Sequence, residues 1–135
     1  MSKAITRLNP AGMLKSPAFS QAIKVKGNGS TIYVGGQNAV NEKNEVIGKG
    51  DVKKQTEQVL KNITVALKAG GADWENVIKL SIYIVQGQNA KDMYEYYQKF
   101  LGENPNPPIV TVVFVAALGN PDILLEIDAV AFVEE

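Results

Sequence analysis

Two long runs of apolar and β-branched residues fill the last quarter of the chain. They extend from Pro108 to Leu118 and from Ile123 to Val133. The stretch between them, Gly119 to Asp122, has turn chemistry, because glycine and asparagine tolerate positive φ and proline fixes its own φ. Two apolar runs of strand length on either side of such a turn are typical of a buried β-hairpin. We therefore expect these two strands to pair with each other.

Two carboxylates, Glu126 and Asp128, interrupt the second apolar run. Side chains alternate along a strand, so residues two apart lie side by side on one face. A carboxylate buried without a partner is too costly to be stable. We therefore expect this face of the strand to meet solvent, a partner subunit or a cleft.

The rest of the chain alternates between strand-like and helix-like patterns. One helix is expected after the cap residue Asp51, and the glycines at 70 and 71 should end it. A second helix should start at the cap residue Asn89 and end at Gly102. Strands are expected at residues 19–26, 31–34 and 77–85, with a hairpin turn at 27–29 and an extended arm at 3–16.

This order of elements predicts an α+β fold in a single domain of residues 1–135. One mixed β-sheet would carry two helices packed on one face. Two helices can cover only one face of a sheet, yet the run 109–117 is apolar at nearly every position. A large apolar face left in water would promote aggregation. We therefore expect an oligomer in which the sheets of several chains pack together.

The charge balance and the missing residue types restrict the chemistry. Fourteen basic residues cancel fourteen acidic ones, which argues against a non-specific binder of nucleic acid or of anionic membranes. The chain has neither Cys nor His, so disulfides, thiolate or His-based nucleophiles and the usual zinc sites are excluded. We expect no metal and no cofactor. The polar opening and the lack of a long apolar run predict a cytoplasmic protein.

Several motifs, taken in order, resemble those of the Rid (YjgF/YER057c/UK114) family, which comprises small trimeric proteins. Residues 17–22, Pro-Ala-Phe-Ser-Gln-Ala, resemble the family's Gly-Pro-Tyr-Ser-Gln-Ala with one inserted residue. Residues 35–37, Gly-Gly-Gln, resemble its Ser-Gly-Gln. The segments 58–71, 77–79 and 125–131 are similar to its long helix, a following strand and its closing motif. The resemblance covers nearly the whole chain and implies the chorismate-mutase-like (YjgF/L-PSP) sandwich.

The resemblance also implies a homotrimer with three clefts between neighbouring subunits. In the best-known members these clefts hydrolyse imines or enamines that pyridoxal-phosphate enzymes form from amino acids. Glu126 and Gly36 match the family's water-positioning carboxylate and its cleft backbone. Val110 stands in place of an arginine that binds the substrate carboxylate, Phe19 in place of a tyrosine and Met93 in place of an asparagine. The implied catalytic residue is Glu126, and the other four are the implied ligand-binding positions.

These substitutions lead to three hypotheses. In the first, a Rid-type trimer that lacks the carboxylate anchor binds a small uncharged or apolar molecule and hydrolyses an imine-like substrate with Glu126 and a bound water. A positioned water and a proton acceptor suffice for this reaction, so His is not required. In the second, the protein is a non-enzymatic ligand-binding protein, or a chaperone-like interaction protein whose clefts are vestigial, and Glu126 is structural. In the third, a Lys or a backbone N–H replaces the anchor and amino-acid imines remain substrates.

Overall fold

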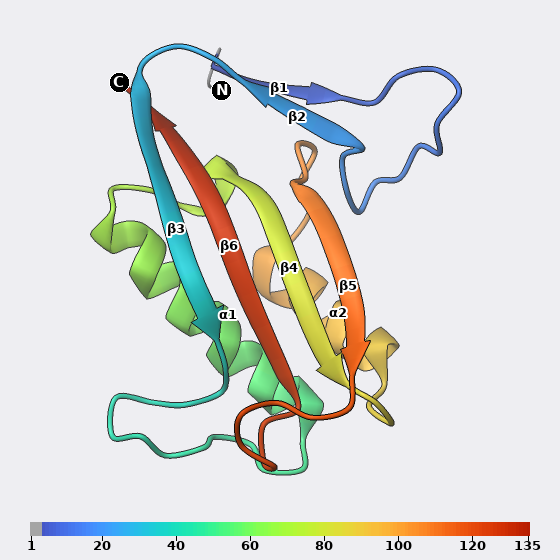
Figure 1. The fold of residues 1–135 in the computed structure, drawn as a ribbon, viewed down its shortest axis with the longest axis vertical. Coiled ribbons are helices and arrows are strands. Elements are labelled where there is room, and N and C mark those ends of the chain that lie inside the picture. The colour runs from blue at the N-terminus through green and yellow to red at the C-terminus, as the bar shows by residue number, and fades with distance from the viewer. Residues whose placement is uncertain (1–3) are drawn as a thin grey trace.

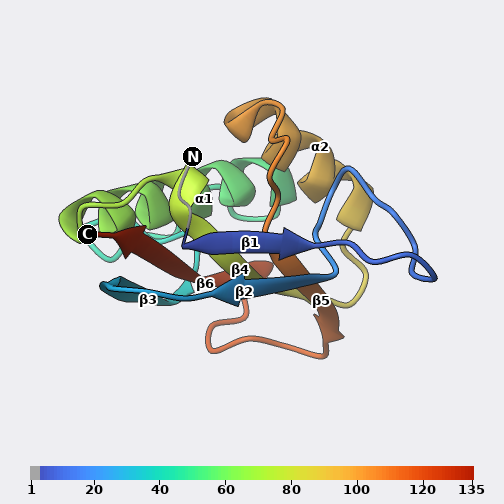
Figure 2. The ribbon, with the colours of Figure 1, turned by 90° about the horizontal axis from the view of Figure 1, so that it is seen from above.

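The computed structural model describes residues 4–135, and its centre is a four-stranded mixed sheet (Figure 1). The strands lie in the order β3 (Gly29–Gln37), β6 (Leu125–Glu134), β4 (Val77–Val85) and β5 (Ile109–Val115). β6 is antiparallel to both of its neighbours, whereas β4 and β5 run parallel. Helices α1 (Val52–Ala69) and α2 (Ala90–Leu101) lie on one face of this sheet (Figure 2). The expected α+β architecture is confirmed.

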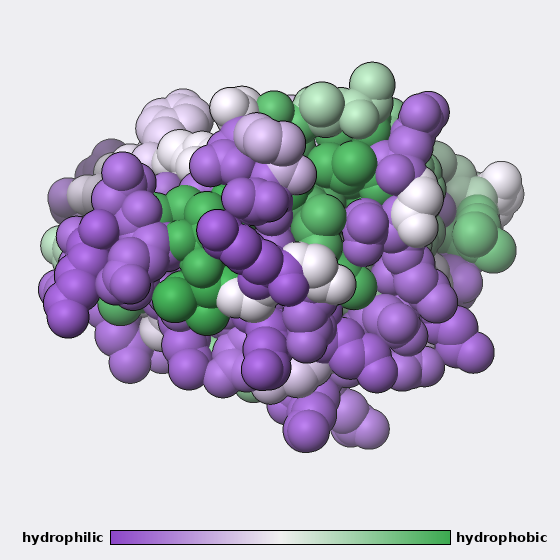
Figure 3. All heavy atoms as spheres, turned by 90° about the horizontal axis from the view of Figure 1, so that it is seen from below, coloured by the Kyte–Doolittle hydropathy of each residue, from purple (hydrophilic) through white to green (hydrophobic). Residues whose placement is uncertain are grey.

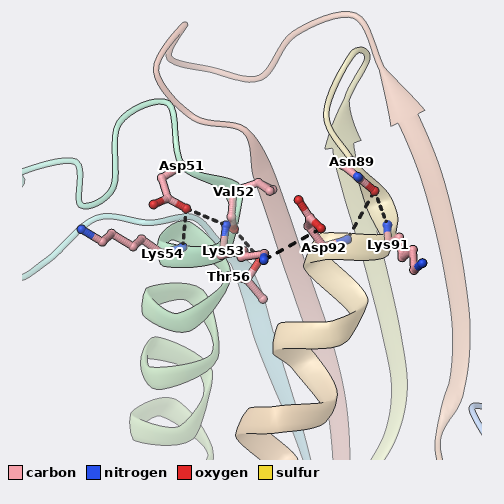
Figure 4. A network of polar contacts seen from close by, with 8 residues as sticks. All are labelled: Asp51, Val52, Lys53, Lys54, Thr56, Asn89, Lys91 and Asp92. Carbon is pink, nitrogen blue, oxygen red and sulfur yellow. Dashed lines mark hydrogen bonds and ion pairs between the residues drawn. The ribbon is translucent and has the colours of Figure 1, made fainter.

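Side-chain caps determine where both helices begin, and they are the residues expected from the sequence (Figure 4). Asp51 Oδ1 accepts hydrogen bonds from the backbone N–H groups of the second and third residues of α1, each at 3.1 Å. Asn89 does the same for α2 at 2.9 and 3.3 Å. Lys53 Nζ lies 4.0 Å from Asp92 Oδ1, so the first turns of the two helices are neighbours. Such caps stabilise a helix by about 1 kcal/mol each.

A layer of aliphatic side chains joins the helices to the sheet. The buried positions recur at helical spacing along α1 and alternate along β4 and β6. Side chains without exposed surface are Val59, Leu60, Ile63 and Leu67 on α1, Leu80 and Ile84 on β4, and Leu125, Ile127 and Ala131 on β6. Burial of one large aliphatic side chain contributes about 1.5–3 kcal/mol, so this layer is the main source of stability. Among the described residues, no helix is long and apolar enough to cross a bilayer.

The expected hairpin between the last two strands is wrong. β4 lies between β5 and β6, and pairs with both. The turn at residues 119–122 does form, since Asn120 accepts hydrogen bonds from the N–H groups of Asp122 and Ile123. It belongs to a longer connection, residues 116–124, that passes the end of β4. Both runs are apolar for different reasons: β6 is central, whereas β5 is an edge strand covered by α2 on part of one face.

The N-terminal strands form a separate pair. β1 (Ile5–Leu8) and β2 (Ala22–Val25) are antiparallel partners in a two-stranded sheet. The hairpin expected across residues 27–29 is therefore wrong, and part of the expected extended arm is a strand. β3 pairs with β6 instead. Burial of Phe132 accounts for this arrangement, because Ile5 and its neighbours in the two-stranded sheet pack over that ring on the face opposite the helices.

Gln55 is the polar link inside the core. It lies on α1 with no exposed surface. Its Nε2 donates hydrogen bonds to the carbonyl oxygens of Gly48 at 3.1 Å and Asp122 at 2.8 Å, and its Oε1 accepts one from the N–H of Leu124 at 2.8 Å. One side chain thus fixes α1 against the loop that precedes it and against the connection that leads into β6.

We expect Gln55→Ala to lower the free energy of unfolding by about 2–4 kcal/mol, because it opens a space and leaves a buried N–H unpaired. Urea denaturation followed by circular dichroism measures this change. Gln58→Ala is the matched control: Gln58 lies on the same helix and donates to Asn62 in a partly exposed position. Its expected cost is below about 1 kcal/mol. Equal losses for the two variants would contradict the role of Gln55.

Candidate functional site

The five residues predicted to form the site separate into two groups, one on each face of the sheet. Glu126 and Gly36 lie together on the face that the helices leave uncovered. Phe19, Met93 and Val110 line one pocket on the side of α2. The structure therefore brings the predicted ligand-binding residues Phe19, Met93 and Val110 together. It places the fourth, Gly36, beside the predicted catalytic residue Glu126.

Alternation along β6 places Glu126 on the uncovered face. Its neighbours Leu125 and Ile127 are fully buried toward the helices, whereas Glu126 and Asp128 are half-buried. The two carboxylates thus share a face, as expected. Tyr83 of β4 is the cross-strand partner of Glu126. Residues opposed in an antiparallel pair have Cβ atoms about 5 Å apart, so Tyr83 and Glu126 are neighbours on this face of the sheet.

A bulge in β3 brings Gly36 against the Glu126 side chain. Val34 pairs with Ala129 and Gln37 pairs with Ile127, so one more residue lies on β3 than on β6 between these pairs. A Cβ atom on Gly36 would overlap the Glu126 carboxylate and would lie 2.8 Å from its Cδ. Glycine at this position therefore lets the carboxylate lie directly against the backbone. Bulges are frequent next to active sites, where they redirect side chains.

The second group forms an apolar pocket of about 130 Å³ between α2, the β4–β5 edge and the segment before β2. Phe19, Met93 and Val110 line it. The sequence reasoning did not assign to the pocket its other lining residues, which are Ala18, Ile82, Tyr94, Tyr97 and Val112. None of the eight residues carries a charged side chain. The pocket therefore offers no ion-pair partner to a substrate carboxylate.

Two tyrosines of α2 form one wall of the pocket. The rings of Tyr94 and Tyr97 are stacked, with centroids 6.2 Å apart and an angle of 15° between their planes. The Tyr94 hydroxyl accepts a hydrogen bond from Gln98 Nε2 at 3.0 Å. Burial raises the pKa of Tyr97 to about 12, so its phenol stays protonated at neutral pH. Helical spacing could have revealed this wall, because Tyr97 lies four residues after Met93 and three after Tyr94, and residues at these two spacings are neighbours on a helix surface.

Ser20 fixes the position of Phe19. It is almost fully buried, its N–H donates to the Pro108 carbonyl at 3.0 Å, and its hydroxyl donates to the Pro107 carbonyl at 2.6 Å. These two bonds hold the segment before β2 against the residues that lead into β5. Phe19 consequently lies beside Val110, although about ninety residues separate them in the sequence.

Within one chain, Glu126 and the pocket do not meet. Val110 pairs with Leu80, whereas Glu126 pairs with Tyr83, three residues further along β4. That separation is about 10 Å along the strand. Val110 also points to the helix side of the sheet and Glu126 to the other side. A small molecule in the pocket of one chain therefore does not reach Glu126 of that same chain.

The sequence matches the family model described as Endoribonuclease L-PSP over residues 13–133. It is 38% identical to a RutC family protein of Pyrococcus horikoshii, over 86% of this chain and 87% of that one. It is 32% identical to the human 2-iminobutanoate/2-iminopropanoate deaminase, over 84% of this chain and 78% of that one.

Solved structures show the same fold over nearly the whole chain. YyfB of Yersinia pestis, a Rid-family protein of unknown function, superimposes with a TM-score of 0.83 and 30% identity, covering 96% of this chain and 99% of that one. E. coli TdcF with bound serine gives a TM-score of 0.69 at 26% identity, covering 90% and 98%. Sequence and fold together show that the chain belongs to the Rid (YjgF/YER057c/UK114) family.

Proposed function

We propose that this chain forms a homotrimer whose clefts between subunits bind a small molecule and hydrolyse an imine or enamine. The proposal rests on the separation between Glu126 and the pocket within one chain. Glu126 lies on the uncovered face of the sheet and the pocket lies on the other side, so a neighbouring chain is needed to bring the two together. The name of the human relative, an imine deaminase, supports the same reaction class.

The uncovered face of the sheet supports assembly. Tyr33 of β3 and Val113 of β5 point away from the helices and are 79% and 41% exposed. Seen from the end at which β4 and β5 finish, hydrophobic side chains gather toward this face in the upper part of Figure 3, and hydrophilic ones surround the helices below. Apolar surface of this kind is usually covered by a partner.

The reaction needs one carboxylate. Glu126 would hold a water and take its proton while the water oxygen bonds to the carbon of a protonated imine, whose C=N electron pair moves to nitrogen. The protonated carboxyl would then pass its proton to that nitrogen and accept the proton of the new hydroxyl as the C–N bond breaks. The ammonia that leaves takes that last proton from the carboxyl and becomes ammonium, which restores the Glu126 carboxylate; the other product is a carbonyl compound. General acid–base catalysis of this kind contributes about 10²–10⁴-fold.

Val110 makes the standard amino-acid imines poor substrates in this proposal. A charge-assisted hydrogen bond contributes about 1.5–3 kcal/mol, which corresponds to roughly 10- to 100-fold in binding. The pocket lining contains no charged side chain that could replace it. In the third hypothesis a Lys or a backbone N–H replaces the arginine, and no Lys is among the residues that line this pocket.

A second candidate function is non-enzymatic binding of a ligand or an unfolded partner. The favouring observation is β5, an edge strand on which Val112, Val113 and Phe114 are all more than 40% exposed. Exposed apolar edge strands attract other chains. The 130 Å³ pocket favours ligand binding over vestigial clefts, because Phe19 and Met93 leave it open.

Assembly is tested by sedimentation equilibrium. We expect a mass three times that of the 14.6 kDa chain. Val113→Lys places a charge on the uncovered face and should shift the protein toward single chains. Val65→Lys, at an exposed position of α1, should leave the mass unchanged. A wild-type protein with the mass of one chain would contradict the proposal.

The missing anchor is tested by restoring it. We expect wild-type protein to hydrolyse 2-iminobutanoate slowly and Val110→Arg to raise kcat/KM by about 10- to 100-fold, because the guanidinium can pair with the substrate carboxylate. Ammonia release in a coupled assay measures this rate. Val110→Met has a similar length without the charge and should give no gain. Fast turnover by the wild type would show that the anchor is not needed.

Glu126 is tested in the Val110→Arg background, where a defined substrate is available. Adding Glu126→Gln should lower kcat by about 10²–10⁴-fold, since the amide does not accept a proton from water. Asp128→Asn, two residues away on the same face, should change kcat by less than about threefold. If both changes have the same effect, Glu126 has no specific role in the reaction.

A further inference from the structure

We infer that the pocket between α2 and β5 binds a benzene-sized, uncharged apolar group, such as an aryl or branched alkyl group. The inference rests on the proposed function, because it names the ligand class of the same site. It goes further because it assigns the ligand class to the pocket, which one chain forms alone. Binding in the pocket can therefore be measured separately from catalysis.

The size of the pocket sets the size of the group. The space measures about 130 Å³. An apolar protein cavity of about 150 Å³ stays dry and binds benzene, so this pocket suits a ring of six atoms or an alkyl group of similar volume. A bare methyl or ethyl group would leave much of the space unfilled and would lose the corresponding dispersion contacts.

The lining sets the chemistry of the group. Phe19 and the stacked pair Tyr94 and Tyr97 present aromatic surface, and Val110 and Ile82 present branched aliphatic surface. Aromatic side chains favour ring partners in stacked or edge-to-face geometry. A carboxylate placed here would lose its hydration without gaining a cation, which is a large cost. The lining thus favours an apolar group and disfavours an anionic one.

The pocket is held open by structure that does not depend on a ligand. Ser20 fixes the Phe19 segment through two hydrogen bonds, Val110 lies in the β4–β5 ladder, and Met93 is 3% exposed beneath them. Ligand binding therefore needs little ordering of the walls, which reduces its entropic cost. Exposed Val112 and Tyr94 lie among the lining residues, so the space is reachable from solvent.

Methionine methyl groups provide the readout. The chain has three methionines, of which Met93 lines the pocket and Met13 lies exposed elsewhere. In protein labelled with ¹³C at the methionine methyls, toluene should shift the Met93 signal saturably through its ring current and leave the Met13 signal in place. Benzoate at the same concentration should shift neither. Equal shifts with benzoate, or shifts of Met13 alone, would overturn the inference.

Filling the pocket should abolish the effect. Val110→Phe and, from the other wall, Ala18→Leu should each weaken toluene binding by about tenfold or more, because they occupy the space. Val65→Phe makes the same change at an exposed position of α1 and should bind as the wild type does. Circular dichroism shows whether each filling variant is folded. If one of them is not, the other still tests the pocket. Unchanged binding in both would exclude this pocket as the site.

The outcome is distinguishable from the proposed function. Toluene binding is read from the Met93 methyl signal and imine hydrolysis from ammonia release, so either property can fail without the other. If imines are not hydrolysed but toluene binds, the reaction fails and the pocket assignment stands. If Val110→Arg hydrolyses 2-iminobutanoate but the wild type does not bind toluene, the pocket assignment alone fails.

Discussion

A four-stranded sheet has two faces, and two helices can bury only one of them. In this chain the aliphatic residues of α1 pack on the alternate residues of β4 and β6 that point inward, such as Leu80 and Ile127. Side chains on the opposite face must be covered by another part of the structure or by another chain, or remain in contact with solvent. The β1–β2 pair covers Phe132 at one end, and the rest of that face carries Glu126, Tyr83 and exposed apolar residues. The distribution of the candidate site over two faces follows directly from this constraint.

The sequence was informative where structure depends on neighbouring residues. Both helices begin at the expected caps, Asp51 and Asn89, and alternation placed Glu126 and Asp128 on one face. Strand order was not predictable in this way. Whether β5 pairs with β6 depends on which strand buries more apolar surface in a central position of the sheet. The residue pattern of each strand, taken alone, does not contain that comparison. A turn at residues 119–122 therefore suggested a hairpin that β4 prevents.

The candidate site shows the same division. The resemblance to the Rid family pointed to Phe19, Met93 and Val110 as site residues. The structure places all three around one pocket. Neither the resemblance nor the hydrophobic pattern revealed that the three lie opposite Glu126, because residues matched one by one carry no information about the face on which each lies. Tyr94 and Tyr97 stack on each other as side chains of an amphipathic helix do, but their rings line the pocket. An aromatic side chain that packs in a core and one that lines a pocket occupy the same helical positions, so the sequence pattern does not distinguish them.

The bulge at Gly35 and Gly36 has a consequence for how this strand tolerates change. Between Val34 and Gln37 the sheet needs a single residue to continue its ladder to β6, and the chain supplies two. Loss of either glycine would leave the flanking residues on their present faces, so the architecture itself does not require both. What would disappear is the close contact between backbone and the carboxylate at 126. The extra residue of β3 therefore serves the close approach to Glu126, and a strand shortened by one glycine would keep the fold without that contact.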